Sequence, residues 1–216
     1  MNTTTRRVLL LGAVCAVSGA LGSVPTTSSS GLASQDPAGW VMRSSVGTLA
    51  TYSVGIDSVI AHGGTRSAYI QFQGIEPQGW ATLMQTFRAD AYRGKRVRLS
   101  AFVKTQDVEA GALLWMRIEG PGDSVLAFDN MGDRPIRGAP DWWLHDIVLE
   151  VPTRASAIAI GLLLEGGGRV WIDDVTVSVV APDVALTAPL ANPRARGRAA
   201  PVTPTGERAR NLDFEH

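Results

Sequence analysis

The chain has 216 residues, of which 45% are hydrophobic, and its formal net charge is zero. This length supports one domain with a real core plus tails, and the apolar fraction is too high for a disordered protein. The first 33 residues hold two arginines and no acid, so the remainder carries a charge of −2. That balance argues against a nucleic-acid partner.

The N-terminus has the anatomy of a signal peptide. Arg6 and Arg7 precede an almost unbroken apolar run at 8–20, and a Ser/Thr cluster follows at 26–30. A positive start and a short apolar run predict export, and residues 5–9 are similar to a twin-arginine signal. We therefore expect residues 1–35 to be signal peptide and linker, the protein to be secreted or periplasmic, and membrane contact to occur only through this segment. An uncleaved anchor is the alternative.

Cys15 is the only cysteine and lies inside the apolar run. If the signal is removed, the mature chain has no disulfide, no thiol nucleophile and no cysteine zinc ligand. The fold is then expected to depend on its core alone, helped at most by another kind of metal.

Residues 36–181 are expected to form the globular domain, because their apolar residues recur with a period of two rather than 3.6. Strands are predicted at 67–72, 81–88, 97–104, 113–118, 143–151, 157–164 and 170–180, with glycine-rich turns between them. The nearly continuous apolar run 157–164 indicates a strand covered on both faces. Seven or eight short strands predict an all-β antiparallel β-sandwich or jelly roll.

The C-terminal region separates into two parts by composition. Residues 182–210 are rich in Pro, Ala and Arg, which predicts an extended linker with little packing. In 211–216, Leu212 and Phe214 alternate with polar residues. This segment is expected either to dock on the sandwich as an added edge strand or to form a disordered tail.

Four segments together resemble bacterial galactose-binding-like domains. They are 92–100 (YRGKRVRLS), 128–138 (FDNMGDRPIRG), 141–142 (DW) and 170–175 (VWIDDV). The resemblance covers roughly residues 37–180 and implies a galactose-binding-like jelly roll similar to carbohydrate-binding modules. Such domains are often fused to DNA-binding or hydrolase domains, but no helix-turn-helix or catalytic segment is recognised here. A fold shared by many functions says little about which one is present.

One predicted strand presents a candidate ligand face. Because side chains alternate, Trp115, Arg117 and Glu119 share a face, opposite an apolar one. A Trp ring can stack on a sugar while the charged groups bind hydroxyls, and this combination suits a small-ligand site. In the alternative, Trp115 packs under other groups and Arg117–Glu119 is an ordinary pair.

The loop 129–135 offers a second set of ligand-binding candidates. Asn130 and Arg134 would form one rim of a ligand site. Asp and Asn also fix tight turns through local hydrogen bonds, so a structural loop with an internal Asp–Arg pair is the alternative.

The resemblance also implies a structural calcium. Related jelly rolls often bind calcium at a "DDV" position with a Glu from an "FE" segment, which here would be Asp173, Asp174 and Glu215. Calcium accepts such carboxylate oxygens. One of the adjacent aspartates must be buried, and pairing with Arg, backbone N–H or water is the alternative.

No catalytic motif is found, and the three histidines have no metal-ligand spacing within one element. His62, beside two glycines, is read as a turn residue. We expect an exported, non-catalytic domain binding carbohydrate or a related small ligand. The alternatives are a structural or protein-interaction sandwich of the cell envelope and, less favoured, a weak hydrolase using two unidentified carboxylates.

Overall fold

The computed structural model describes residues 36–45, 51–188 and 203–216, and the predicted signal peptide lies outside these ranges. Ten strands account for most of the described chain, joined by short loops and two single turns of 3₁₀-helix, η2 (Asp90–Tyr92) and η3 (Pro121–Asp123). Within these ranges no helix has the length and hydropathy needed to cross a membrane. The strands are β1 (Val41–Ser44), β2 (Tyr52–Asp57), β3 (Ser67–Phe72), β4 (Trp80–Arg88), β5 (Lys95–Gln106), β6 (Gly111–Gly120), β7 (Ser124–Asp129), β8 (Trp143–Val151), β9 (Ala157–Glu165) and β10 (Arg169–Val180).

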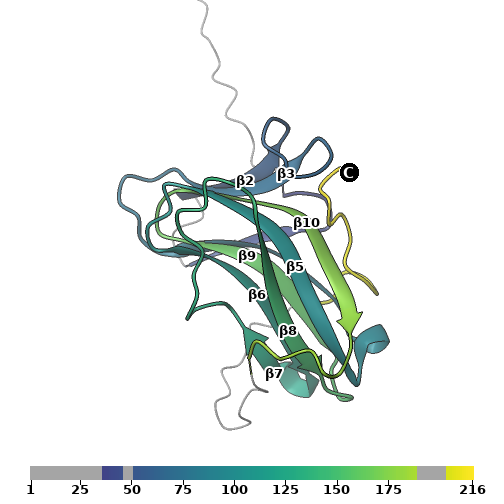
Figure 1. Ribbon diagram of the computed structural model, residues 1–216. Helices are drawn as coiled ribbons and strands as arrows, with labels where there is room; N and C mark the ends of the chain where they lie inside the picture. Colours follow the sequence, from purple (N-terminus) through teal and green to yellow (C-terminus); the bar gives the residue numbers. More distant parts are fainter. Residues whose placement is uncertain (1–35, 46–50, 189–202) are drawn as a thin grey trace, which may run out of the picture. The chain divides into compact units, whose positions relative to one another are not determined.

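These strands form two five-stranded antiparallel sheets that pack face to face (Figure 1). The first sheet has the order β1-β4-β9-β6-β7 and the second the order β2-β3-β10-β5-β8. Several neighbours in each sheet are distant in sequence, so the chain crosses repeatedly between the sheets, as in a jelly roll. The expected all-β antiparallel β-sandwich is confirmed.

The strands predicted from alternation are found with small shifts at their ends. β3 and β8 have the predicted bounds, and β5 is longer than expected at both ends. β1, β2 and β7 lie outside the strands predicted from the sequence. In β2 the apolar residues do alternate, at 52, 54 and 56. On the opposite face a Cβ at Gly55 would lie 2.9 Å from the Tyr69 hydroxyl, so a closely approaching ring explains the glycine.

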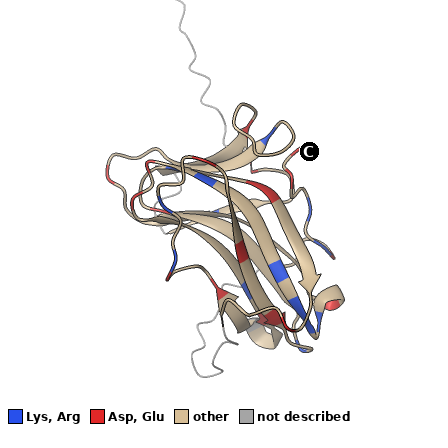
Figure 2. Cartoon of the chain, in the orientation of Figure 1, with Lys and Arg blue, Asp and Glu red and all other residues tan. Residues whose placement is uncertain are grey.

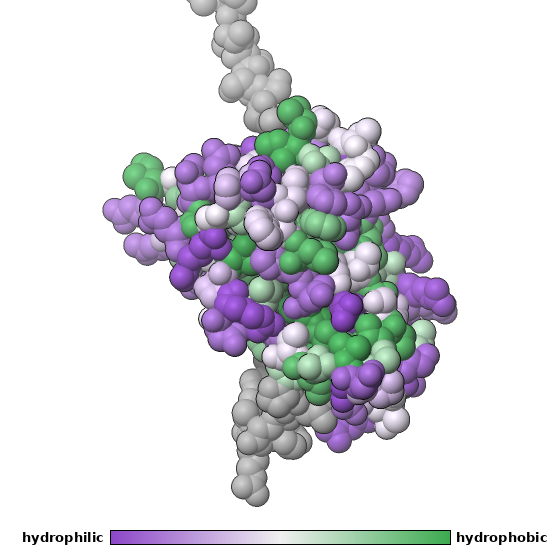
Figure 3. Space-filling view, viewed as in Figure 1, coloured by the Kyte–Doolittle hydropathy of each residue, from purple (hydrophilic) through white to green (hydrophobic). Residues whose placement is uncertain are grey.

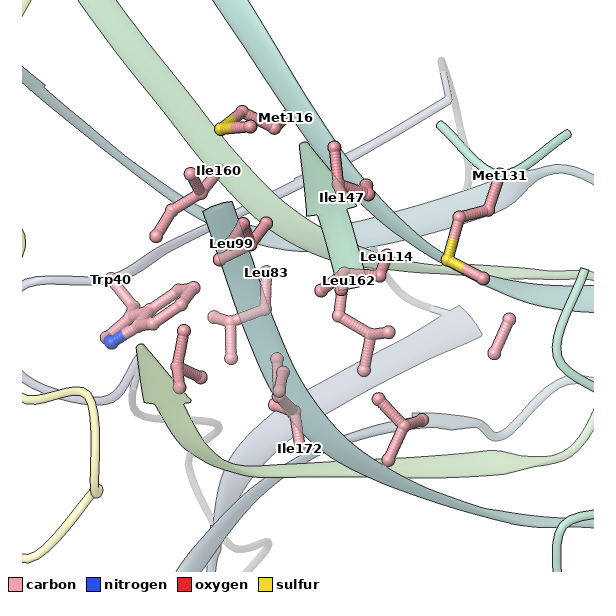
Figure 4. Close-up of a cluster of buried hydrophobic side chains, with 14 of the residues drawn as sticks. Trp40, Leu83, Leu99, Leu114, Met116, Met131, Ile147, Ile160, Leu162 and Ile172 are labelled. Carbon is pink, nitrogen blue, oxygen red and sulfur yellow. The ribbon is translucent and has the colours of Figure 1, made fainter. Parts of the chain in front are cut away.

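The core lies between the inner faces of the two sheets (Figure 4). Leu83, Leu114 and Ile160 from the first sheet meet Leu99 and Ile172 from the second, and each is at most 1% exposed. Most of β9 is buried on both faces, as its continuous apolar run predicted.

The described parts of the predicted linker lie against the sandwich. Thr187 exchanges hydrogen bonds with the backbone of Val148 on the end strand β8, at 3.0 Å in each direction. On another strand, β4, Thr86 accepts from the Thr205 amide at 2.9 Å. The described parts of the predicted linker, 182–188 and 203–210, thus bond to the sandwich while their side chains are all exposed or half-buried, and the linker itself stays a prediction.

The C-terminal segment docks on the sandwich but adds no strand. Phe214 is fully buried, and its ring centroid lies 5.3 Å from that of Trp40. Asn211 and Phe214 have φ values of 47° and 56°, a left-handed conformation incompatible with a regular strand. The segment thus closes one end of the core rather than extending a sheet.

Candidate functional site

The predicted platform at Trp115 is buried on the outer face of the first sheet. Only 7% of Trp115 is exposed, and its indole N–H donates to Thr82 Oγ1 at 2.9 Å. Across the strand pair stands Gly161, where a Cβ would lie 2.7 Å from the Trp115 ring. The ring therefore rests against β9 at a position that only glycine leaves open.

Apolar side chains surround the indole. Met84 and Ala159 are buried against it, with Val41 and Leu163 at the margin. The expectation that Trp115 is an open stacking surface is therefore wrong, because the ring is the centre of a small second core on the outer face.

The two charged residues beside Trp115 bind each other. Arg117 donates to Glu119 Oε1 from Nε at 2.9 Å and from Nη2 at 2.5 Å, and the Glu119 side chain is 7% exposed. The Arg117 guanidinium also lies 5.8 Å from the centre of the Trp115 ring. Both groups are thus largely engaged within the protein, and a ligand role for them stays a prediction.

The loop with Asn130 and Arg134 is held by local bonds. Asn130 Oδ1 accepts from the Gly132 amide at 3.2 Å, and Arg134 pairs with Asp129 at 2.6 Å and with Asp133 at 2.8 Å. Burial tends to raise the Asp129 pKa, but the bonds from Arg134 and neighbouring groups leave it below its ordinary value. No hydrogen bond, ion pair or ring contact in the described residues joins this loop to Trp115, Arg117 or Glu119.

A β-bulge in β10 shapes the outer face of the second sheet. The register with β5 shifts between Asp173 and Thr176, and Asp174 has a φ of 46°. A bulge re-aims the side chains next to it. As a result, the two aspartates both reach the loop that joins β2 to β3, rather than pointing to opposite faces as strict alternation predicts.

Asp173 is the buried carboxylate of the pair, with no exposed surface. Its Oδ2 accepts from the amides of His62 at 2.7 Å and Gly63 at 3.1 Å, and its Oδ1 accepts from Asp174 at 2.8 Å. Burial raises the Asp173 pKa, although these bonds act in the opposite direction. The required partners of the buried carboxylate are therefore backbone N–H groups.

Glu215 holds the other end of the same loop. Its Oε1 accepts from the amides of Thr65 at 2.6 Å and Arg66 at 2.9 Å, and its Oε2 accepts from the Thr65 hydroxyl at 2.7 Å. The bonds from Thr65 contribute most to lowering the Glu215 pKa.

The three carboxylates expected to bind calcium thus meet around one loop, and their oxygens accept hydrogen bonds from it. The described residues contain no group of three or more His, Cys, Asp or Glu side chains placed to hold a metal ion. The arrangement of donors present does not fit a calcium shell, and calcium binding stays a prediction.

The same loop places the exposed His62 against two half-buried aromatic side chains. The His62 ring stacks on Phe102 of β5, with centroids 3.5 Å apart and planes 13° from parallel. Trp142 meets it edge-on at 5.9 Å and 72°. His62 Nδ1 lies 2.7 Å from Asp174 Oδ2, and these two side chains are 31% and 39% exposed. We call these four residues the His62 cluster.

The pairing with Asp174 fixes the chemistry of the imidazole. A carboxylate only accepts hydrogen bonds, so Nδ1 carries the hydrogen and Nε2 of the neutral ring is an acceptor. The cluster therefore combines aromatic surface, a ring nitrogen and carboxylate oxygens. The sequence singled out Asp174 and the segment 141–142, but His62 was expected to be only a turn residue beside two glycines, so the cluster as a whole was not predicted.

A neighbouring group on the second sheet is closed by its own contacts. Arg169 lies between the rings of Tyr69 and Trp171, 4.3 Å and 4.5 Å from their centres, and pairs with Asp57 at 2.8 Å. Burial tends to raise the Asp57 pKa, yet bonds from Trp171 and two loop amides lower it overall.

The surface around the His62 cluster is mixed in character. Basic and acidic residues alternate over the strands of this face, without a large region of one sign (Figure 2). Apolar groups lie between polar ones in the same view (Figure 3). Next to the cluster, Trp143 and Leu144 are 62% and 53% exposed. Such a surface suits a neutral, partly apolar ligand better than a polyanion.

The chain is similar to known proteins in sequence and in structure, but these similarities do not assign it to a family. No family model matches the chain. An uncharacterized HTH-type transcriptional regulator, YbfP of Bacillus subtilis (strain 168), is 43% identical over 150 residues, which are 69% of this chain and 50% of that protein. The chain therefore spans about half the length of this curated relative.

Solved structures with a similar arrangement include carbohydrate-binding modules. One is TmCBM61 in complex with β-1,4-galactotriose, at 15% identity and a TM-score of 0.45, covering 67% of this chain and 91% of that one. Another is the CBM22-1 xylan-binding domain of Paenibacillus barcinonensis Xyn10C, at 15% identity and a TM-score of 0.43, covering 66% and 86%.

Proposed function

We propose that the protein is an exported, non-catalytic binding domain for carbohydrate, and that its ligand site is the His62 cluster. The observation that carries the proposal is the partly exposed corner between His62 and the half-buried Trp142, whose rings stand at 72°, with the Asp174 carboxylate bonded to His62. Partly accessible aromatic surface is thereby joined to fixed polar groups within one small area.

The chemistry of a sugar ring matches this corner. One face of a pyranose presents C–H groups, which pack against the electron-rich face of an aromatic ring. Its hydroxyls both donate and accept, so they can donate to His62 Nε2 or to Asp174. Small-ligand sites in proteins combine apolar walls with a few such polar groups.

The arrangement supports binding rather than turnover. A His–Asp pair is two parts of a hydrolase triad, whose nucleophile must be within hydrogen-bond reach of the histidine. Among the described contacts of His62 there is no Ser, Thr or Cys side chain, and the nearby Thr65 hydroxyl donates to Glu215. A protein nucleophile is therefore not part of the proposed site.

A protein partner is the second candidate, favoured by exposed Trp143 and Leu144 beside the cluster. Because successive side chains of a strand point to opposite sides, Leu144, which pairs with Phe102, is the one that shares the outer face with the cluster. Large exposed apolar side chains are typical of interaction surfaces. Export through the N-terminal segment would direct this binding function outside the cytoplasm.

A melting-temperature screen of the protein against soluble glycans tests the proposal. A ligand that binds only the folded state raises the melting temperature by mass action. For a glycan that raises the melting temperature, we expect His62→Ala and Trp142→Ala each to weaken the affinity about tenfold. Central aromatic contacts contribute more than ~1 kcal/mol to the binding free energy. Titration calorimetry measures the affinity.

Phe128→Ala is the matched control, because Phe128 is an exposed aromatic residue of the other sheet's outer face, 41% accessible. Its affinity is expected to equal that of the parent. If both cluster variants bind the glycan as well as the parent does, the site is elsewhere. If no glycan binds and a protein is captured only when Trp143 and Leu144 are intact, the second candidate replaces the first.

A further inference from the structure

We infer that Asp173 and Glu215 are positioning residues that hold the loop 62–66, so that the last residues of the chain help to build the ligand site. The statement that this loop belongs to a ligand site rests on the proposed function. The contacts that hold the loop do not involve a ligand. They join three parts of the chain that are distant in sequence: the β2–β3 loop, the bulge of β10 and the C-terminal segment.

The loop needs an external support because its backbone has few partners of its own. Four of its amides, at positions 62, 63, 65 and 66, donate to carboxylates rather than to a sheet neighbour. Asp173 receives the first two and Glu215 the last two. Hydrogen bonds to charged groups are the stronger ones, so two side chains fix both ends of a five-residue loop.

The glycines in the loop follow from this close approach. At Gly63 a Cβ would lie 2.5 Å from Asp174 Oδ2, and at Gly64 it would collide with Glu215 Oε1. Gly64 also has a φ of 56°, which only glycine adopts without strain. The two glycines of the His-Gly-Gly sequence therefore leave the space that the surrounding carboxylates occupy.

The C-terminal segment is itself anchored to the sandwich, so the backbone that carries Glu215 is held in place. Phe214 is buried in the core, the Trp40 indole donates to the Asn211 carbonyl at 3.0 Å, and Gln85 and Arg210 exchange two hydrogen bonds. Figure 1 shows this segment, in yellow, running beside β10 and ending near the β2–β3 loop. The segment thus acts as a clasp between the core and the loop.

Glu215→Ala tests this role in the full chain. The first readout is the NMR chemical shift of the His62 ring protons. The Phe102 ring, stacked 3.5 Å away, moves this shift from its free-histidine value. The second is hydrogen exchange at the amides of Thr65 and Arg66. We expect the ring shifts to move toward free-histidine values and both amides to exchange at least about tenfold faster, because a charge-assisted bond is lost. Where a glycan binds, its affinity falls about tenfold as well.

Glu207→Ala is the control, since Glu207 is an exposed carboxylate of the same C-terminal stretch and has no described contact with Glu215 or the loop 62–66. It should leave both readouts at parent values, and Asp173→Asn should disturb the amides of His62 and Gly63 instead. Unchanged ring shifts and exchange in Glu215→Ala would overturn the inference, whether or not any glycan binds. A melting-temperature rise with calcium that Glu215→Ala abolishes would also overturn it, by making Glu215 a metal ligand.

Discussion

The outer faces of the two sheets use similar residues in opposite ways. On the first sheet, Trp115 lies flat against Gly161 and its polar neighbours bind one another. On the second, a loop carries His62 onto Phe102 and leaves the imidazole and the Asp174 carboxylate accessible. An outward position in a strand therefore does not make a side chain accessible, because the residue opposite it and the loops that pack on it determine its exposure.

The cause is local in each case. Glycine on the neighbouring strand creates a slot that an indole fills, and filling it removes apolar surface from water. A bulge in the middle of β10 shifts its register with β5 and brings two carboxylates to the loop that joins β2 to β3. On the first sheet, the aromatic side chain is buried and contributes to stability. On the second sheet, the bulge leaves polar groups of the candidate site exposed.

Trp115→Ala should break the first face. Because the ring is buried and its N–H is bonded to Thr82, the loss of stability is expected to be about 3–5 kcal/mol, as for other buried aromatic side chains. Chemical denaturation measures it, and Phe128→Ala should change stability by less than about 0.5 kcal/mol. A Trp115→Ala protein that is fully stable yet has lost glycan binding would restore the first face as the ligand site.

Gly64→Ala should disturb the second face. The substitution forces a Cβ into a left-handed conformation and against Glu215, so we expect a loss of about 1–3 kcal/mol. Gly122→Ala is the matched control: its φ of 64° is similar, but nothing lies within 4 Å of the added Cβ. The difference between the two variants reports the Glu215 contact, and equal losses would mean that this contact contributes nothing.

Much of the sandwich, but little of the site, could be predicted from the sequence. Alternation located β3 and β8, since burial of one face imposes a period of two. The exposure of Trp115 depends on Gly161, a partner across a strand pair that sequence alone does not reveal. The clasp joins Thr65 to a residue 150 positions away. The "DDV" and "FE" segments did indicate that these carboxylates act near one another, although not that they would hold a loop.

Low pH should weaken the loop on the second face without affecting the buried Trp115 on the first, and this effect is expected to be smaller than those of the two substitutions above. The Glu215 pKa is lowered by its bonds from Thr65, so the folded state binds this proton less readily than the unfolded chain does. Its stabilisation is therefore complete above the ordinary value of 4.5 and is lost as the pH falls through the lowered pKa. The bond between the Trp115 indole and Thr82 involves no titrating group and should persist.

Comparing the parent with Glu215→Gln isolates this contribution. Asp173, whose pKa is raised, acts in the opposite direction, and Arg66, His62 and Asp174 face the same loop, but all four are common to both proteins. We expect the parent to melt at the higher temperature near neutral pH and the gap to close as the pH falls below 4.5. A gap that stays constant through acid would show that the Glu215 charge does not support the loop, and that the shape of its side chain alone is enough.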